Sequence, residues 1–153
     1  MIFIILIPAV FILGVSYYFC ARLIYPRVFS VDYTYQFDID NGRANEAEYL
    51  ARPRQEVKIE SPYGYPLQVA YFPQNGAQKT VVMSHGITWS MYGMMKYMNL
   101  FSLRGYNILL YDLRNHGRSG RCNTTFGYYE KHDLKAVVDW AFSQLGPQGK
   151  VGT

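Results

Sequence analysis

Charge and cysteine are the scarce features of this sequence. No Asp, Glu, Lys or Arg occurs before Arg22, and the whole chain holds only two cysteines, Cys20 and Cys122. Two cysteines without a Cys-x-x-Cys motif encode neither a disulfide framework nor a cysteine zinc site. The 15 Lys and Arg residues outnumber the 11 Asp and Glu residues, but they form no basic block. We therefore expect no nucleic-acid partner.

Motifs for metal ions and nucleotides are absent as well. The sequence has no GxGxxG or Walker loop. The metal-capable side chains near one another in sequence match no ligand spacing that proteins commonly use; they are His116, Cys122, His132 and Asp133. We expect no metal ion and no cofactor.

The uncharged N-terminus predicts one transmembrane helix over residues 2–21. At about 1.5 Å per residue, a helix of this length spans the roughly 30 Å hydrocarbon core of a bilayer. A cleaved signal peptide is the alternative, but the segment lacks a basic start and a small-x-small cleavage site. Arg22 and Arg27 flank its C-terminal side, so the positive-inside rule predicts a single-pass protein with its domain in the cytoplasm.

Residues 22–56 form a juxtamembrane segment between this helix and the rest of the chain. From Phe29 to Asp40 apolar and polar residues alternate, which predicts a strand. Glu46 to Arg52 has the composition of a short helix that Pro53 ends.

Residues 57–153 alternate between strand and helix patterns, which predicts an α/β layered sheet. A hairpin of Val57–Glu60 and Leu67–Phe72 comes first. The remaining elements are expected to be strand Thr80–Ser84, helix 90–103, strand Tyr106–Tyr111, helix 128–145 and a last strand that begins at Lys150. Met91, Met94, Met95 and Met98 recur at helical spacing, which favours core packing over the alternative of a wall for an apolar ligand.

Two loops follow the buried strands at the sheet edge where α/β proteins bind ligands. The first is His85-Gly86-Ile87-Thr88, and the second runs from Asp112 to Gly120 (DLRNHGRSG). Their order and separation, followed by Thr124 to Glu130, resemble the α/β-hydrolase superfamily over residues 55–153. The pattern is most similar to membrane-anchored bacterial hydrolases of the serine-aminopeptidase-like, lipase-like branch. This resemblance implies an α/β fold: the N-terminal half of a hydrolase sheet, preceded in sequence by one transmembrane helix.

The resemblance also implies roles for individual residues. The residue after His-Gly donates its backbone N–H to the oxyanion in such enzymes, which selects Ile87 first and Thr88 second. The other motif residues would shape the two loops; they are His85, Gly86, Asp112, Arg114, His116, Gly117 and Ser119.

The sequence departs from the family in one respect: it contains no Gly-x-Ser-x-Gly nucleophile elbow. Ser119 lacks that context, so we assign no catalytic residue and expect this chain alone to be inactive. We predict the N-terminal part of a membrane-anchored serine hydrolase acting on an ester, thioester or amide with a small apolar acyl group. The alternative is a non-catalytic membrane-bound interaction module.

The expected partners are the lipid bilayer and a second copy of the chain. In the hydrolase strand order, Thr80–Ser84 lies between Tyr106–Tyr111 and the strand that Lys150 begins. Only a short stretch of that last strand is present, and the exposed edge would be apolar. An apolar edge without Pro or charge favours self-association.

Overall fold

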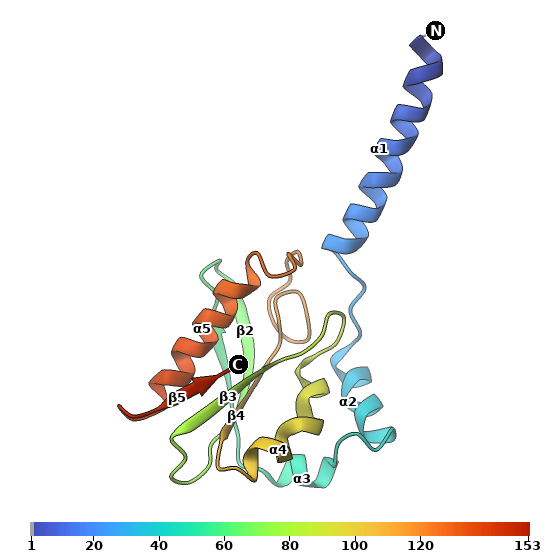
Figure 1. Cartoon of the computed structure of the whole chain (residues 1–153). Helices are drawn as coiled ribbons and strands as arrows, with labels where there is room; N and C mark the ends of the chain where they lie inside the picture. The colour runs from blue at the N-terminus through green and yellow to red at the C-terminus, as the bar shows by residue number, and fades with distance from the viewer. Residues whose placement is uncertain (1) are drawn as a thin grey trace.

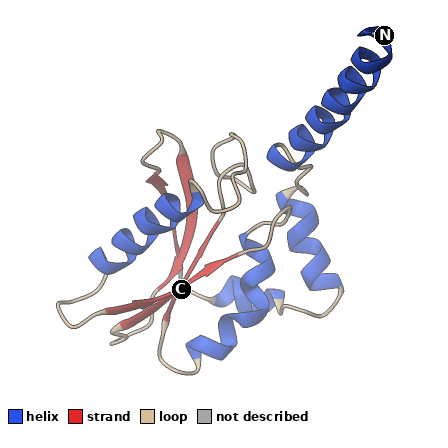
Figure 2. Cartoon of the chain, turned by 45° about the horizontal axis from the view of Figure 1, so that its top comes forward, coloured by secondary structure: helices blue, strands red, loops and turns tan. Residues whose placement is uncertain are grey.

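The computed structural model describes residues 2–153, with the side chains of residues 6–153. A long helix, α1 (Ile2–Ile24), projects away from a domain built on a five-stranded sheet (Figure 1). Helices lie on both faces of this sheet (Figure 2), which gives a layered α/β domain.

Helix α1 is the apolar segment that the sequence indicates. Its stretch Leu6–Ile24 has a mean hydropathy of 1.7, and none of it is buried against the domain. The length and composition fit a membrane span, and a signal sequence near the N-terminus has the same two properties.

Residues 31–40 are helical, so the predicted strand over Phe29–Asp40 is wrong. Helix α2 (Val31–Asp40) begins after Ser30, whose Oγ accepts a hydrogen bond from the Tyr33 N–H at 3.2 Å. Thr34 and Asp38 are the buried side chains of this helix, and Thr34 Oγ1 lies 2.5 Å from Ser90 Oγ. The inward stripe of α2 therefore contains polar residues, which is why its helical period did not stand out in the sequence.

The short helix α3 (Glu46–Ala51) follows as predicted. Asn45 Oδ1 accepts a hydrogen bond from the Glu48 N–H at 3.1 Å, and Arg52 ends the helix just before Pro53. An N-cap of this kind satisfies one of the free amide groups at a helix start.

The sheet has the order β1-β2-β4-β3-β5. Strands β1 (Gln55–Glu60) and β2 (Pro66–Phe72) form the predicted antiparallel hairpin, and β2 also pairs antiparallel with β4 (Asn107–Tyr111). Strand β3 (Lys79–Ser84) is parallel to β4 and to β5 (Lys150–Gly152), which confirms its predicted position between them. Among the described residues, β5 pairs with residues 79–81 of β3 alone.

The two sheet faces carry separate apolar cores. Alternate residues of the central strands point to opposite faces, as the pleat requires. Ile108 and Leu110 of β4 pack in the core beneath α2 and the helical segment of residues 91–102. Leu109 and Tyr111 pack on the other face, beneath α5 (Glu130–Ser143).

Residues 91–102 are helical, but they form two pieces rather than one continuous α-helix. The 3-10 helix η1 (Met91–Tyr97) leads into α4 (Met98–Ser102). Met91, Met95 and Met98 are buried in the core on that face. The structure thus agrees with core packing for these three methionines, whereas Met94 is only partly buried.

Candidate functional site

The candidate site lies where β3 and β4 end. Ser84 and Tyr111 are register partners in this parallel pair, so the loops that follow them begin side by side. The carboxyl edge of parallel strands is the usual ligand-binding edge of α/β sheets. We call residues 85–90 the first loop and residues 112–120 the second loop.

Two buried histidines brace these loops reciprocally. His85 of the first loop accepts a hydrogen bond through Nε2 from the Leu113 N–H at 3.0 Å, and His116 of the second loop accepts one through Nε2 from the Thr88 N–H at 3.0 Å. The Nδ1 atom of each ring lies 2.8 Å from a backbone oxygen, that of Gly86 and that of Arg114 respectively. Both rings therefore have the neutral tautomer with the proton on Nδ1.

The electrostatics of His85 match this bracing position. Burial in the domain lowers the pKa of His85 to about 4. A neutral, buried imidazole whose two nitrogens are both hydrogen-bonded holds the backbone in place and has no lone pair free for a substrate proton.

Asp112 joins the second loop to the start of η1. Its Oδ1 accepts a hydrogen bond from the Met91 N–H at 2.7 Å, and its Oδ2 accepts one from the Arg118 N–H at 2.8 Å. The carboxyl is buried, and this desolvation raises its pKa, with the two amide donors acting in the opposite direction. Gly117 lies against this carboxyl with φ +50°, and a Cβ there would come within 2.1 Å of it. Only glycine fits at this position.

Ser119 ties the second loop to the sheet. Its hydroxyl donates to the Asp112 carbonyl oxygen at 2.6 Å and accepts from the Gln68 N–H at 2.9 Å. The side chain is buried. Its proton and one lone pair are thus used within the domain, an arrangement that suits loop fixation rather than nucleophilic attack.

Arg114 is enclosed by tyrosine rings. Its guanidinium carbon lies 4.9 Å from the Tyr129 ring centre, 5.1 Å from that of Tyr65 and 5.9 Å from that of Tyr63. Its Nε donates to Cys122 Sγ at 3.2 Å. Cation–π contacts of this kind hold the second loop against the β1–β2 turn and the start of α5.

Ile87 lies on the exposed part of the first loop, with 47% of its surface accessible. Within the described part of the chain its N–H donates to no acceptor, whereas the N–H of Thr88 is taken by His116. Thr88 also has φ +70°. Of the two sequence candidates, Ile87 thus has the backbone donor that is free to bind a ligand.

Two cavities meet at Ile87. One of about 170 Å³ is lined by Leu113, Thr124 and Phe126 among others, and we call it the Phe126 cavity. The other, of about 270 Å³, lies on the α2 side and includes Trp89 and Met94. A group held at Ile87 would have space on both sides.

The turn over residues 124–130 forms part of a cavity wall, which was not predicted from the sequence. Glu130 fixes this turn, because its carboxylate accepts hydrogen bonds from the N–H groups of Thr125 and Gly127. Burial opposes the ionisation of Glu130, but these hydrogen bonds lower its pKa. The Gly127–Glu130 spacing of a capping box was the available signal. No three metal-capable side chains come together among the described residues.

Comparisons with known proteins agree with this geometry. The family model of the X-Pro dipeptidyl-peptidase (S15 family) matches residues 35–153. The Bacillus subtilis (strain 168) protein YqkD is 33% identical over 115 residues, which cover 75% of this chain and 38% of YqkD. The esterase Pf2001 of Pyrococcus furiosus is 33% identical, with a TM-score of 0.60 over 71% of this chain and 43% of the esterase. The α/β hydrolase GrgF of a Penicillium species, 22% identical with a TM-score of 0.58 over 65% of this chain and 36% of GrgF, shares the fold.

The chain therefore spans about two-fifths of the length of YqkD and of the esterase. The family match covers well over half of the chain, and the five-stranded sheet fits part of an α/β-hydrolase. The chain belongs to the X-Pro dipeptidyl-peptidase (S15) family and has part of an α/β-hydrolase fold.

Proposed function

We propose that the chain is the N-terminal part of a membrane-anchored serine hydrolase that cleaves an ester, thioester or amide of an apolar acyl group. The observation that carries this proposal is the free N–H of Ile87, on a loop held by His85, His116 and Asp112. The esterase likeness supports ester cleavage, and the family supports an acyl-transfer site of the peptidase type.

In this proposal Ile87 supplies one donor of an oxyanion hole. A backbone N–H aimed at the developing oxyanion stabilises the tetrahedral intermediate by roughly 3 kcal/mol, provided that it does not have to reorganise. The reciprocal histidine brace and the two hydrogen bonds to Asp112 give the loop that rigidity. The nucleophile, its base and its acid would come from sequence that follows Thr153 in a longer protein.

The anchor is the second part of the proposal. Helix α1 is apolar and unburied, and Tyr18 with Arg22 lies near its C-terminal end. Aromatic and basic residues at such a position favour a membrane–water interface. We place the domain on the cytoplasmic side because Arg22 and Arg27 follow the apolar segment.

The reading frame after Thr153 provides the first test. An in-frame Gly-x-Ser-x-Gly shortly after this residue supports the hydrolase, and its serine should be labelled by a fluorophosphonate probe. A stop codon directly after Thr153 would instead favour a non-catalytic interaction module.

The role of Ile87 is tested in that longer protein with two substitutions at one position. Ile87→Pro removes the N–H and should lower kcat by about 10²- to 10³-fold with little change in KM. Ile87→Ala keeps the N–H and should retain most of kcat. Equal losses in both variants would show that the side chain, and not the backbone donor, is what matters.

A further inference from the structure

The base of α1 is hydrogen-bonded directly to the candidate site. The Thr124 N–H donates to the Ile24 carbonyl oxygen at 2.8 Å, and the Phe29 N–H donates to the Thr88 carbonyl oxygen at 2.9 Å. Thr124 lines the Phe126 cavity, and Thr88 is the neighbour of Ile87. The end of the apolar helix and the chain that follows it are thus tied to both sides of the site.

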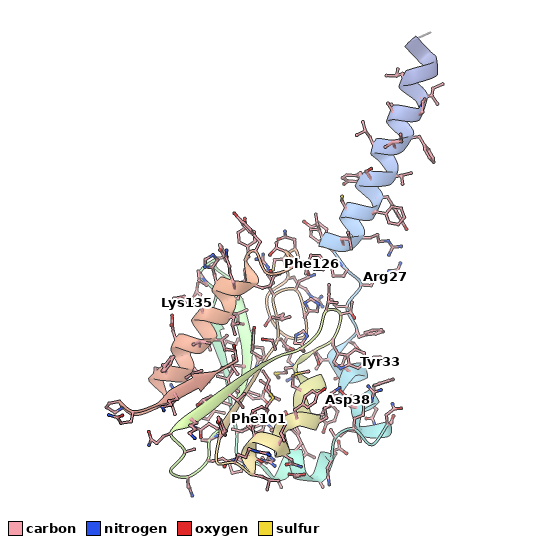
Figure 3. The ribbon with its side chains drawn as sticks, in the orientation of Figure 1. Arg27, Tyr33, Asp38, Phe101, Phe126 and Lys135 are labelled. Atoms are coloured by element: carbon pink, nitrogen blue, oxygen red, sulfur yellow. The ribbon has the colours of Figure 1, made fainter. Side chains whose placement is uncertain are left out.

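Aromatic side chains are exposed on the segments next to the Phe126 cavity. Tyr25 is 64% exposed, Phe126 is 63% exposed and Tyr128 is 67% exposed. Figure 3 shows Phe126 and Arg27 beside the base of α1, with Phe101 at the opposite end of the domain. Tyrosine and other aromatic rings prefer the headgroup level of a bilayer.

Positive charge accompanies these rings. Arg22 and Arg27 are exposed at the end of α1, and Lys131 Nζ lies 5.5 Å from the ring centre of Tyr128. Exposed cations of this kind are attracted to an anionic leaflet. The same end of the domain therefore combines an apolar helix, interfacial aromatics and basic groups.

We propose that the mouth of the Phe126 cavity lies on the membrane surface and that the site takes its substrate from the bilayer, as the acyl ester of a membrane amphiphile. This inference rests on the anchored hydrolase proposed above. Helix α1 leaves the domain at the edge where β3 and β4 end (Figure 1), so a bilayer around α1 lies over this edge. An acyl chain can then pass from the lipid phase to Leu113 and Ile87 without exposing its methylene groups to water, which would be unfavourable.

Photo-crosslinking from lipids tests this orientation with the chain in vesicles. The vesicles contain phosphatidylcholine and phosphatidylglycerol, with a phosphatidylcholine that carries a diazirine either at the end of one acyl chain or in the headgroup. We expect the acyl probe to react with Leu113 and Phe126 as well as α1, and the headgroup probe to react near Tyr25 and Tyr128. Leu103, which is 86% exposed and precedes β4, should react with neither probe.

A matched pair of variants separates cavity entry from surface contact. Ile87→Trp should abolish the acyl crosslinks at Leu113 and preserve the headgroup crosslinks at Tyr128, whereas Leu103→Trp should preserve both. Acyl crosslinks confined to α1, or equal reaction at Leu103, would overturn the inference. Crosslinking needs no turnover. A missing nucleophile elbow would therefore refute the proposed hydrolase without affecting the interpretation of the crosslinks.

Discussion

Replacing Gly117 by alanine tests how the two loops are held together. The added Cβ would meet all three carboxyl atoms of Asp112 at 2.1 to 2.2 Å. Asp112 cannot move away freely, because it is buried and accepts hydrogen bonds from the Met91 and Arg118 N–H groups. Either the carboxyl or the second loop must shift.

Two terms add to the expected loss of stability. A non-glycine residue in the left-handed region costs about 1 kcal/mol. Each hydrogen bond to the carboxylate contributes about 1.5 to 3 kcal/mol, so losing both costs about 3 to 6 kcal/mol more. Gly105 is the matched control, since it has φ +71° and no atom within 4 Å of an added Cβ. Gly105→Ala should therefore cost only about 1 kcal/mol.

Urea unfolding of each variant in detergent micelles, followed by circular dichroism, measures these differences. Equal losses for Gly117→Ala and Gly105→Ala would refute the packing argument. If Gly117→Ala does not fold, the same substitution can be tested in the Asp112→Ala variant, which lacks the carboxyl group that the new Cβ would meet. In Asp112→Ala, the further change Gly117→Ala should cost only the backbone term of about 1 kcal/mol.

Four further outcomes are expected. Deleting residues 1–21 should release the chain from membranes, and retention in the membrane fraction after carbonate washing would contradict a single anchor. The 153-residue chain should show no fluorophosphonate labelling, whereas labelling that Ser119→Ala removes would contradict a structural Ser119. Burial lowers the pKa of His85 from 6.5 to about 4. Between these pH values the imidazole is protonated in the unfolded chain but not in the folded one. The free energy of unfolding should therefore fall by up to about 3 kcal/mol as the pH drops through this range. The raised pKa of Asp112 has the opposite effect at the acid end of this range. Comparing the denaturation curves of the original chain and His85→Gln at each pH isolates the effect of the histidine. If the pH dependence of unfolding is the same in both, His85 is not buried as a neutral imidazole. Residues 22–153 should self-associate through β3, because no residue that the structure describes pairs with Val82 to Ser84 on the β5 side. A monodisperse monomer with those amides strongly protected in hydrogen exchange would contradict this.

The sheet could be predicted from the sequence because its strands are short apolar or alternating runs bounded by turn residues. Thr80–Ser84 and Tyr106–Tyr111 have this pattern, and both are strands in the structure, with limits that differ by one residue at the start. Helix α2 could not be predicted in the same way. Its buried Thr34 and Asp38 are polar, so the pattern of apolar residues alone has the wrong period.

The candidate site was predictable as a pair of loops but not as a set of contacts. The sequence shows histidines at positions 85 and 116, but not that each accepts a backbone N–H from the other loop, 28 residues away. It therefore could not tell that Thr88 has its N–H occupied. The same applies to Arg114, whose three tyrosines come from two distant parts of the chain and meet only in the folded domain.

The position of β4 between β2 and β3 has a consequence for synthesis of the protein. Strand β2 ends at Phe72, but its second neighbour begins only at Asn107, after β3, η1 and α4 have been made. The edge of β2 that pairs with β4 therefore stays unpaired while the ribosome adds this segment. Closing the loop between β2 and β4 costs entropy before any pairing is gained. During this interval Val69 and Tyr71, which are buried in the finished domain, are available for incorrect pairing. If α1 enters the membrane first, the nascent hairpin is held at the bilayer surface during this interval.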